Sequence, residues 1–142
     1  MRTNLSGDGN VDFKSSTISL GSLTMTRVVL RIDFDDKRYI GHGRIELLEH
    51  IAELGSIAKA AKAMNMSYKR AWYLADSIND TFAEPVIERQ HGGRGGGSAY
   101  LTKFGQILVR DYRGMETRAL KLFAKPLKHL EMRLAPTKRA HR

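Results

Sequence analysis

Apolar and polar residues alternate along residues 25–36, where the first regular pattern of the chain begins. The apolar side chains of this alternation are Val28, Leu30, Ile32 and Phe34. A period of two residues is typical of a β-strand that buries one face. The pattern therefore predicts a strand that ends in a turn at residues 35–37.

The spacing then changes to the three or four residues that separate apolar positions on one face of a helix. Over residues 43–54 this stripe is formed by Ile45, Leu48, Ile51, Ala52 and Leu54. Gly55 follows directly, and glycine is the common residue just after a helix end. We therefore expect one helix over residues 43–54.

Two serines begin the next two helical segments. Ser56 precedes the short segment SIAKAAKAM, and Ser67 precedes a longer segment that ends near Phe82, ahead of Pro85. Serine in this position is a common N-cap. The side chains predicted to meet where the helices cross are Ile57, Ala60, Ala61, Met64 and Met66 on the first, and Ala71, Leu74, Ala75 and Ile78 on the second. Two capped helices with a short connection predict a helix-turn-helix.

A glycine-rich run, GGRGGG, occupies residues 92–97 between the strand-like segments PVIERQH and SAYLT. This arrangement predicts a β-hairpin with a long tip. The run has neither the Gly-x-Gly-x-x-Gly pattern ahead of a helix nor a Gly-Lys-Ser/Thr ending, which excludes a nucleotide phosphate loop. A basic hairpin directly after a helix-turn-helix is typical of a wing that touches the DNA backbone or minor groove.

The last long pattern is helical and begins after Thr102, a further candidate cap. Its apolar stripe is too long for a small domain to cover, so we expect this helix to pair with a copy of itself. The predicted interface residues are Leu108, Tyr112, Met115, Ala119 and Leu122. The alternative is that the stripe packs on its own domain.

The two ends of the chain are polar. Residues 1–24 are rich in Ser, Gly, Asn and Thr, and we expect a flexible arm there. Residues 25–124 form the expected folded domain. Residues 125–142 follow as a basic tail, which contains six Lys and Arg and the single acidic residue Glu131. A short helix through Leu127, Leu130 and Leu134 is also possible in its first part.

Composition narrows the class of protein. The chain has 142 residues, no cysteine and a formal net charge of +9. No apolar run is long enough to span a membrane, and the N-terminus has no apolar signal region, so we expect a cytoplasmic protein that does not enter membranes. A basic balance of this size favours nucleic acid as the partner.

The location of the charge sharpens this expectation. Residues 56–73 carry four basic side chains and no acidic one, and the wing segment 89–103 carries three and none. Basic and aromatic residues at the start of a second helix are the source of major-groove contacts. The predicted contacts to double-stranded DNA are Ser56, Lys59, Ser67, Tyr68, Lys69, Arg70, Trp72, Tyr73, Arg89, His91, Arg94 and Ser98. For Trp72 two interpretations remain open, which are a ring that faces DNA and a ring that packs into the core under the loop that follows the helix.

Catalytic and metal chemistry find little support. The acidic face of the first helix holds Glu46, His50 and Glu53, which could in principle bind a metal. No further cluster of ligands accompanies them in the sequence. A solvated face explains these residues better, so no metal is predicted. We found no paired nucleophile and base, and therefore expect neither an enzyme nor a cofactor.

The chain also resembles a known family. The segments GSIAKAAKAMNMSYKRAW, EP before the wing, GGRGGGSAYLT and Gly105 are similar to the N-terminal DNA-binding domain of ModE-type, molybdate-responsive regulators. The first segment alone is also similar to the LysR-type helix-turn-helix. The resemblance covers about residues 25–116. It implies a mainly α-helical winged helix-turn-helix with a small β-sheet, acting as a homodimer in bacterial-type transcription regulation.

The resemblance also marks a departure. Complete ModE-type proteins continue into oxyanion-binding domains, and 142 residues leave no room for them, so we do not expect this chain to bind molybdate. The leading hypothesis is a standalone, sequence-specific regulator on a two-fold symmetric site. The alternative is a non-specific nucleic-acid-binding or architectural protein, which the charge of +9 and the basic tail would also suit.

Overall fold

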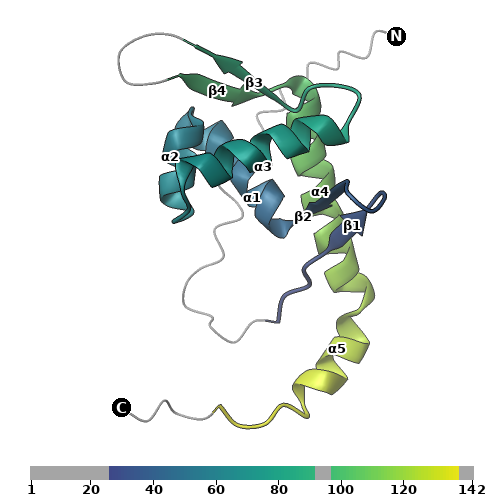
Figure 1. Cartoon of the computed structure of the whole chain (residues 1–142). Helices are drawn as coiled ribbons and strands as arrows, with labels where there is room; N and C mark the ends of the chain where they lie inside the picture. Colours follow the sequence, from purple (N-terminus) through teal and green to yellow (C-terminus); the bar gives the residue numbers. More distant parts are fainter. Residues whose placement is uncertain (1–25, 92–96, 138–142) are drawn as a thin grey trace, which may run out of the picture.

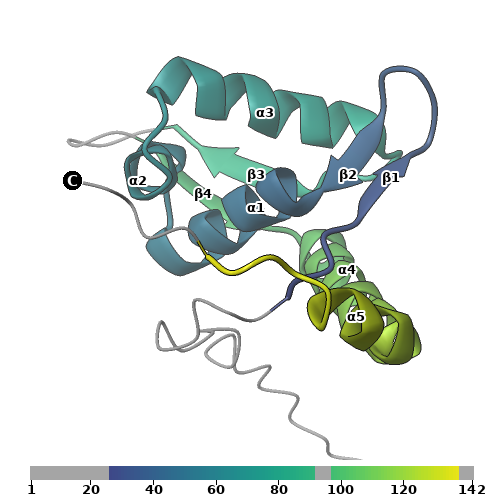
Figure 2. The ribbon, with the colours of Figure 1, turned by 90° about the horizontal axis from the view of Figure 1, so that it is seen from below.

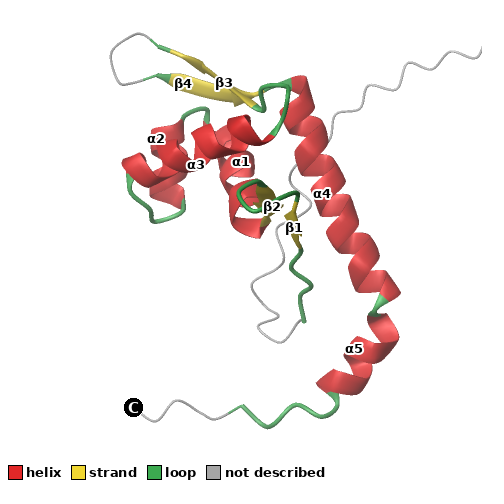
Figure 3. Cartoon of the chain, turned by 45° about the vertical axis from the view of Figure 1, so that its right-hand side comes forward, coloured by secondary structure: helices red, strands yellow, loops and turns green. Residues whose placement is uncertain are grey.

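The computed structural model describes residues 26–91 and 97–137. The expected arm at residues 1–24, the tip residue Arg94 and the last five residues of the expected tail lie outside this part of the chain. Within it the chain is mainly helical and carries two small antiparallel hairpins (Figures 1 and 3). The elements are β1 (Arg31–Asp33), β2 (Tyr39–Gly41), α1 (His42–Leu54), α2 (Ile57–Ala63), α3 (Tyr68–Thr81), β3 (Ile87–Gln90), β4 (Ser98–Leu101), α4 (Lys103–Leu122) and α5 (Ala124–Glu131).

The first hairpin is shorter than the sequence pattern predicted. Only Arg31–Asp33 is strand, and it pairs with β2, which was not predicted because three residues are too few to show a period. The expected turn is present, and the Asp35 carboxylate accepts the N–H groups of Lys37 and Arg38 at 3.0 and 2.8 Å. The hydrogen bond from Lys37 is the largest cause that lowers the pKa of Asp35, and the bond from Arg38 is the next largest. Together the two bonds hold the turn in one shape.

The alternation within this first segment is largely confirmed. Val28, Leu30 and Ile32 are half-buried, whereas Val29 is exposed. Phe34 departs from the prediction because it lies in the turn and is 50% exposed. Its ring still touches the edge of Phe82 at the end of α3, with the centroids 5.7 Å apart.

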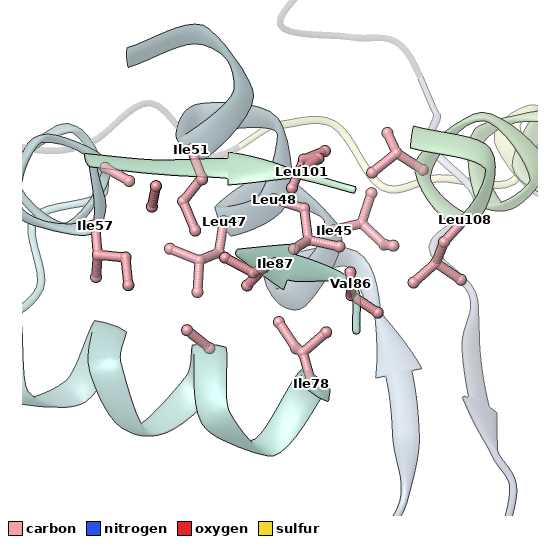
Figure 4. Packing of buried hydrophobic residues seen from close by; sticks show 14 of the residues in the cluster. Ile45, Leu47, Leu48, Ile51, Ile57, Ile78, Val86, Ile87, Leu101 and Leu108 are labelled. Carbon is pink, nitrogen blue, oxygen red and sulfur yellow. The ribbon is translucent and has the colours of Figure 1, made fainter. Parts of the chain in front are cut away.

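The helix-turn-helix forms as predicted, with both serine caps in place. Ser56 Oγ accepts from the Lys59 N–H at 3.0 Å, and Ser67 Oγ accepts from the Arg70 N–H at 3.1 Å. The crossing of α2 and α3 is lined by small side chains that are fully or almost fully buried, namely Ala60, Ala61, Ala71 and Ala75. Small residues let the two backbones approach each other, which brings α3 close enough to share the core in Figure 4.

Helix α1 is more deeply buried than its predicted stripe. It contacts α2, α3, α4, β2 and β4, so Leu47 is fully buried although it lies outside that stripe. Ala52 was predicted to face the core and is exposed instead. Gly55 ends the helix in the left-handed conformation, at φ 76°, as its position predicted.

The second hairpin has the strands that the glycine run separates. β3 and β4 pair from Ile87 opposite Leu101 to Gln90 opposite Ser98. The hairpin is joined to the helix-turn-helix because the Ala99 N–H donates to the Gly55 carbonyl at 2.9 Å. The wing is therefore fixed at its base to the junction between α1 and α2.

Helix α4 begins where it was expected, since Thr102 Oγ1 accepts the Gly105 N–H at 3.0 Å. It begins beside the end of α3, where the ring centroids of Phe82 and Phe104 lie 5.2 Å apart, and then leads away from α3 into α5 (Figures 1 and 2). The break at Phe123 follows from Pro126, which has no N–H to donate to the carbonyl four residues earlier. The first part of the expected tail is thus helical. No helix in the described residues is long and apolar enough to cross a membrane.

Candidate nucleic-acid interface

The exposed face of α3 carries the side chains that the sequence singled out. Tyr68 is 55% exposed and Tyr73 is 71% exposed, although tyrosine is on average only partly accessible in folded proteins. Lys69 and Arg70 are exposed beside them. These four side chains form a basic and aromatic surface at the beginning of α3, which is where a helix-turn-helix presents groups to base edges.

The serine caps leave room for a second role. Ser56 and Ser67 each use the hydroxyl oxygen to accept a backbone N–H. The hydroxyl proton of each is still available, and Ser67 is exposed while Ser56 is half-buried. Lys59 is exposed on α2, one turn after Ser56. Hydroxyls and lysines in such positions suit phosphate oxygens.

Trp72 is half-buried against the core, as the packed interpretation expected, and one side of its ring also lines the groove at the wing. The Arg89 guanidinium of β3 lies over its ring, with Cζ 3.7 Å from the ring centroid. The same guanidinium forms an ion pair with Asp76 of α3, and the Trp72 indole N–H donates to the Tyr68 hydroxyl. The Arg89 side chain is only 18% exposed, so this cluster fastens the wing to α3.

A groove of about 360 Å³ separates the start of α2, α3 and the wing. It brings together predicted contact residues from all three elements, which are Ser56, Tyr68, Trp72, Arg89, His91 and Ser98. Lys59, Lys69, Arg70 and Tyr73 lie outside this groove. Arg94 belongs to the undescribed tip, so its position stays a prediction.

Acidic side chains limit the surface at its other end. Asp76 and Asp80 lie in the second half of α3 and are exposed. The ion pair with Arg89 offsets the charge of Asp76. Because carboxylates repel the phosphate backbone, the first half of α3 is the part of this helix best suited to enter the groove of DNA.

Asn79 is a structural residue that the sequence pattern did not reveal. Its side-chain oxygen accepts the N–H groups of Val86 and Ile87 at 2.8 and 3.0 Å, and its amide donates to the Ile87 carbonyl at 3.0 Å. These bonds hold the start of β3 against α3 and so set the position of the wing. An asparagine ahead of a strand gives no distinctive signal, since the bonds span a loop.

The acidic face of α1 is engaged by neighbouring side chains. Glu46 lies 3.3 Å from His42 and 3.7 Å from His50. Within residues 26–91 and 97–137, no three His, Asp or Glu side chains converge as metal ligands would. Glu49 is bound instead by Arg113 of α4, which also pairs with Glu116 at 2.6 Å. This face thus ties α1 to α4.

Fold and surface together define a winged helix-turn-helix domain of the kind that binds DNA. Residues 42–106 match the family described as bacterial regulatory helix-turn-helix protein, lysR family. Beyond that class, the chain is similar to ModE proteins, as its motifs indicated. It is 42% identical to the molybdenum transport protein ModE of Azotobacter vinelandii over 96 residues, which are 66% of this chain and 36% of the relative.

Two further relatives give the same picture. Identity is 40% over 85 residues to the DNA-binding transcriptional dual regulator ModE of Escherichia coli, covering 60% of this chain and 32% of that protein. It is 43% over 84 residues to the molybdenum-pterin-binding protein MopA of Rhodobacter capsulatus, covering 57% and 32%. The chain thus spans about a third of the length of the curated relatives it matches.

Proposed function

We propose that this chain is a sequence-specific, DNA-binding transcriptional regulator that acts as a homodimer on a two-fold symmetric site. The single observation that carries the proposal is the exposed basic and aromatic face of α3, beside the groove that separates this helix from the wing. The name of the Escherichia coli relative, a DNA-binding transcriptional dual regulator, supports it. The proposal includes a cytoplasmic location, because the promoters of a bacterial-type regulator lie in the cytoplasm.

In the proposed complex the first half of α3 enters the major groove. Arg70 is our candidate for a base contact, because an exposed guanidinium can bind guanine O6 and N7 together. Lys69, Tyr68 and Tyr73 are placed for bases or phosphates at the groove edges. Ser56, Lys59 and Ser98 meet the flanking backbone, and His91 and Arg94 extend that contact along the wing.

The proposed dimer forms through α4. Leu108 and Tyr112, two of the predicted interface residues, are buried inside the protomer, where Tyr112 donates to the Leu30 carbonyl at 2.6 Å. That leaves the later part of α4 for contact between copies. Met115 is 37% exposed and Leu122 is 76% exposed, with Ala119 half-buried between them. An exposed apolar stripe of this kind is stabilised when a second copy covers it.

Selecting bound duplexes from a random pool tests the sequence-specific part. The expected consensus has two inverted halves about one helical turn apart. Arg70→Ala should weaken binding to that consensus by about 1–3 kcal/mol and relax the preference at one base pair in each half. Arg110→Ala removes the same charge from an exposed position of α4, outside the proposed surface, and serves as the control.

The second candidate function is non-specific binding of nucleic acid, which the net charge of +9 favours. It predicts that the random pool yields no consensus and that Arg70→Ala weakens binding to every sequence alike. Molybdate binding is not part of this proposal, because the similarity to proteins named for molybdenum spans about a third of their length.

A further inference from the structure

A second cleft lies beside α3, on the side away from the wing. Its volume is about 640 Å³, and its walls come from the β1–β2 turn, the start of α1 and α3. The residues of α3 that line it are Arg70, Tyr73, Leu74, Ser77 and Asp80, whereas Tyr68 and Trp72 line the groove at the wing. The exposed face of α3 is therefore flanked by a hollow on each side.

Basic side chains outnumber acidic ones around this second cleft. Lys37 and Arg38 come from the turn, Arg70 from α3 and Arg44 from α1, against the carboxylate of Asp80. Arg38 shares its guanidinium with Asp35 at 2.5 Å, whereas Lys37 forms no ion pair among the described residues. The turn that carries both is held in place by the hydrogen bonds to Asp35.

Arg44 is the unusual member of the cleft. It is 6% exposed, and its only side-chain hydrogen bond within the described residues runs from Nη2 to Ser77 Oγ at 2.8 Å. Nε and Nη1 have no partner in residues 26–91 and 97–137, and no carboxylate there lies within ion-pair distance. The Tyr39 ring covers the guanidinium, with Cζ 3.8 Å from its centroid. A buried cation without a counter-charge raises the potential of the space in front of it.

From this arrangement we infer that the cleft binds a phosphate-class oxyanion, and that its source is a backbone phosphodiester of bound DNA. A helix in the major groove lies between two phosphate backbones, and the hollows beside α3 face one backbone each. The groove at the wing takes one strand. The cleft takes the other, with Lys37 and Arg38 meeting the phosphate and Arg44 supplying charge behind them.

This inference rests on the proposed function, and one experiment separates the two. The affinity for the selected duplex and for a scrambled duplex is measured over a range of salt concentrations with the wild type, Lys37→Ala and the control Arg110→Ala. Lys37 is exposed, so its loss leaves the core intact. Lys37→Ala should weaken binding to both duplexes by the same factor and lower the salt slope by about 1, whereas Arg110→Ala should leave the slope unchanged.

A neutral methylphosphonate placed at each backbone position in turn locates the phosphate. At one position on the strand away from the wing, the substitution should abolish the effect of Lys37→Ala, since contact partners are not additive. If the wild type discriminates between the duplexes and Lys37→Ala keeps its slope and affinity, the inference fails while the proposed function stands. If the wild type binds no DNA, both fail.

Titration of inorganic phosphate into the DNA-free protein, followed by calorimetry, examines the other source of the same chemistry. Under the inference, free phosphate shows no saturable binding that depends on Lys37. Saturable binding that is lost in Lys37→Ala, together with an unchanged salt slope on DNA, would assign the cleft to a free oxyanion and overturn the DNA contact.

Discussion

At the scale of single residues, two glycines in α4 show how position decides what a residue must be. A Cβ on Gly105 would lie 2.3 Å from the Val86 carbonyl oxygen, whereas a Cβ on Gly114 would meet nothing within 4 Å. The first glycine therefore lets α4 begin directly against the segment that leads into β3. Nothing in the packing requires the second, which only weakens the helix.

These two glycines give opposite predictions. Gly105→Ala should lower the free energy of unfolding by about 1–3 kcal/mol, because the close approach to Val86 must open. Gly114→Ala should raise it by roughly 0.5–1 kcal/mol, because alanine favours the helix. Urea unfolding followed by circular dichroism measures both, and changes of the same sign would contradict the packing described here.

The buried tyrosine of α4 predicts a dependence on alkaline pH. Burial of Tyr112, with the nearby negative charge of Glu116, raises its pKa above the ordinary value of 10.0. Because the folded state disfavours the charged form, the stabilisation is complete below the unfolded pKa and is lost as the pH rises through the folded pKa. Unfolding measured between pH 9 and 12 (roughly the range that brackets the tyrosine pKa) should show this loss in the wild type, and Tyr112→Phe should reduce it.

At the scale of elements, the wing is oriented by side chains of α3. Asn79 binds the start of β3, and Arg89 joins Trp72 and Asp76 further along. Arg89 was predicted as a DNA contact, and its limited exposure adds a positioning role to that expectation. A wing held in this way meets DNA at a fixed distance from the recognition surface.

The ion pair of Arg89 separates these roles. Arg89→Ala should weaken DNA binding on all sequences alike, since it leaves the Asp76 carboxylate unpaired next to the phosphates. If Arg89 acts mainly through this pair, Asp76→Asn in the same background should restore part of the affinity. An affinity that stays as low in the double variant, measured by fluorescence anisotropy, would assign Arg89 to direct phosphate contact.

The elements were largely predictable because their signals are local. Ser56, Ser67 and Thr102 cap helices as their sequence context indicated, and Gly55 ends α1. The strand β2 was not predictable because three residues show no period, and the bonds of Asn79 were not because they span a loop of irregular structure. The burial of Leu47 was missed because it depends on elements distant in the chain. The burial of Arg44 was also not predictable, because the residues that cover it come from β2 and α3.

At the scale of the whole molecule, α4 and α5 carry an apolar surface that one copy does not cover. Leu122→Glu should shift the protein from dimer to monomer in analytical ultracentrifugation, because a carboxylate cannot be buried at such an interface without a partner. Thr117→Glu adds the same charge at another exposed position of α4 and should leave the dimer intact. A wild type that sediments as a monomer at all concentrations would contradict the proposed dimer.

The affinity ratio between the selected duplex and a scrambled duplex of the same composition, at physiological salt, tests the central claim most directly. A sequence-specific regulator should bind the selected duplex at least about 10³-fold more tightly. A ratio close to one, with both affinities falling equally as salt is raised, would contradict sequence-specific recognition and leave only charge-driven binding.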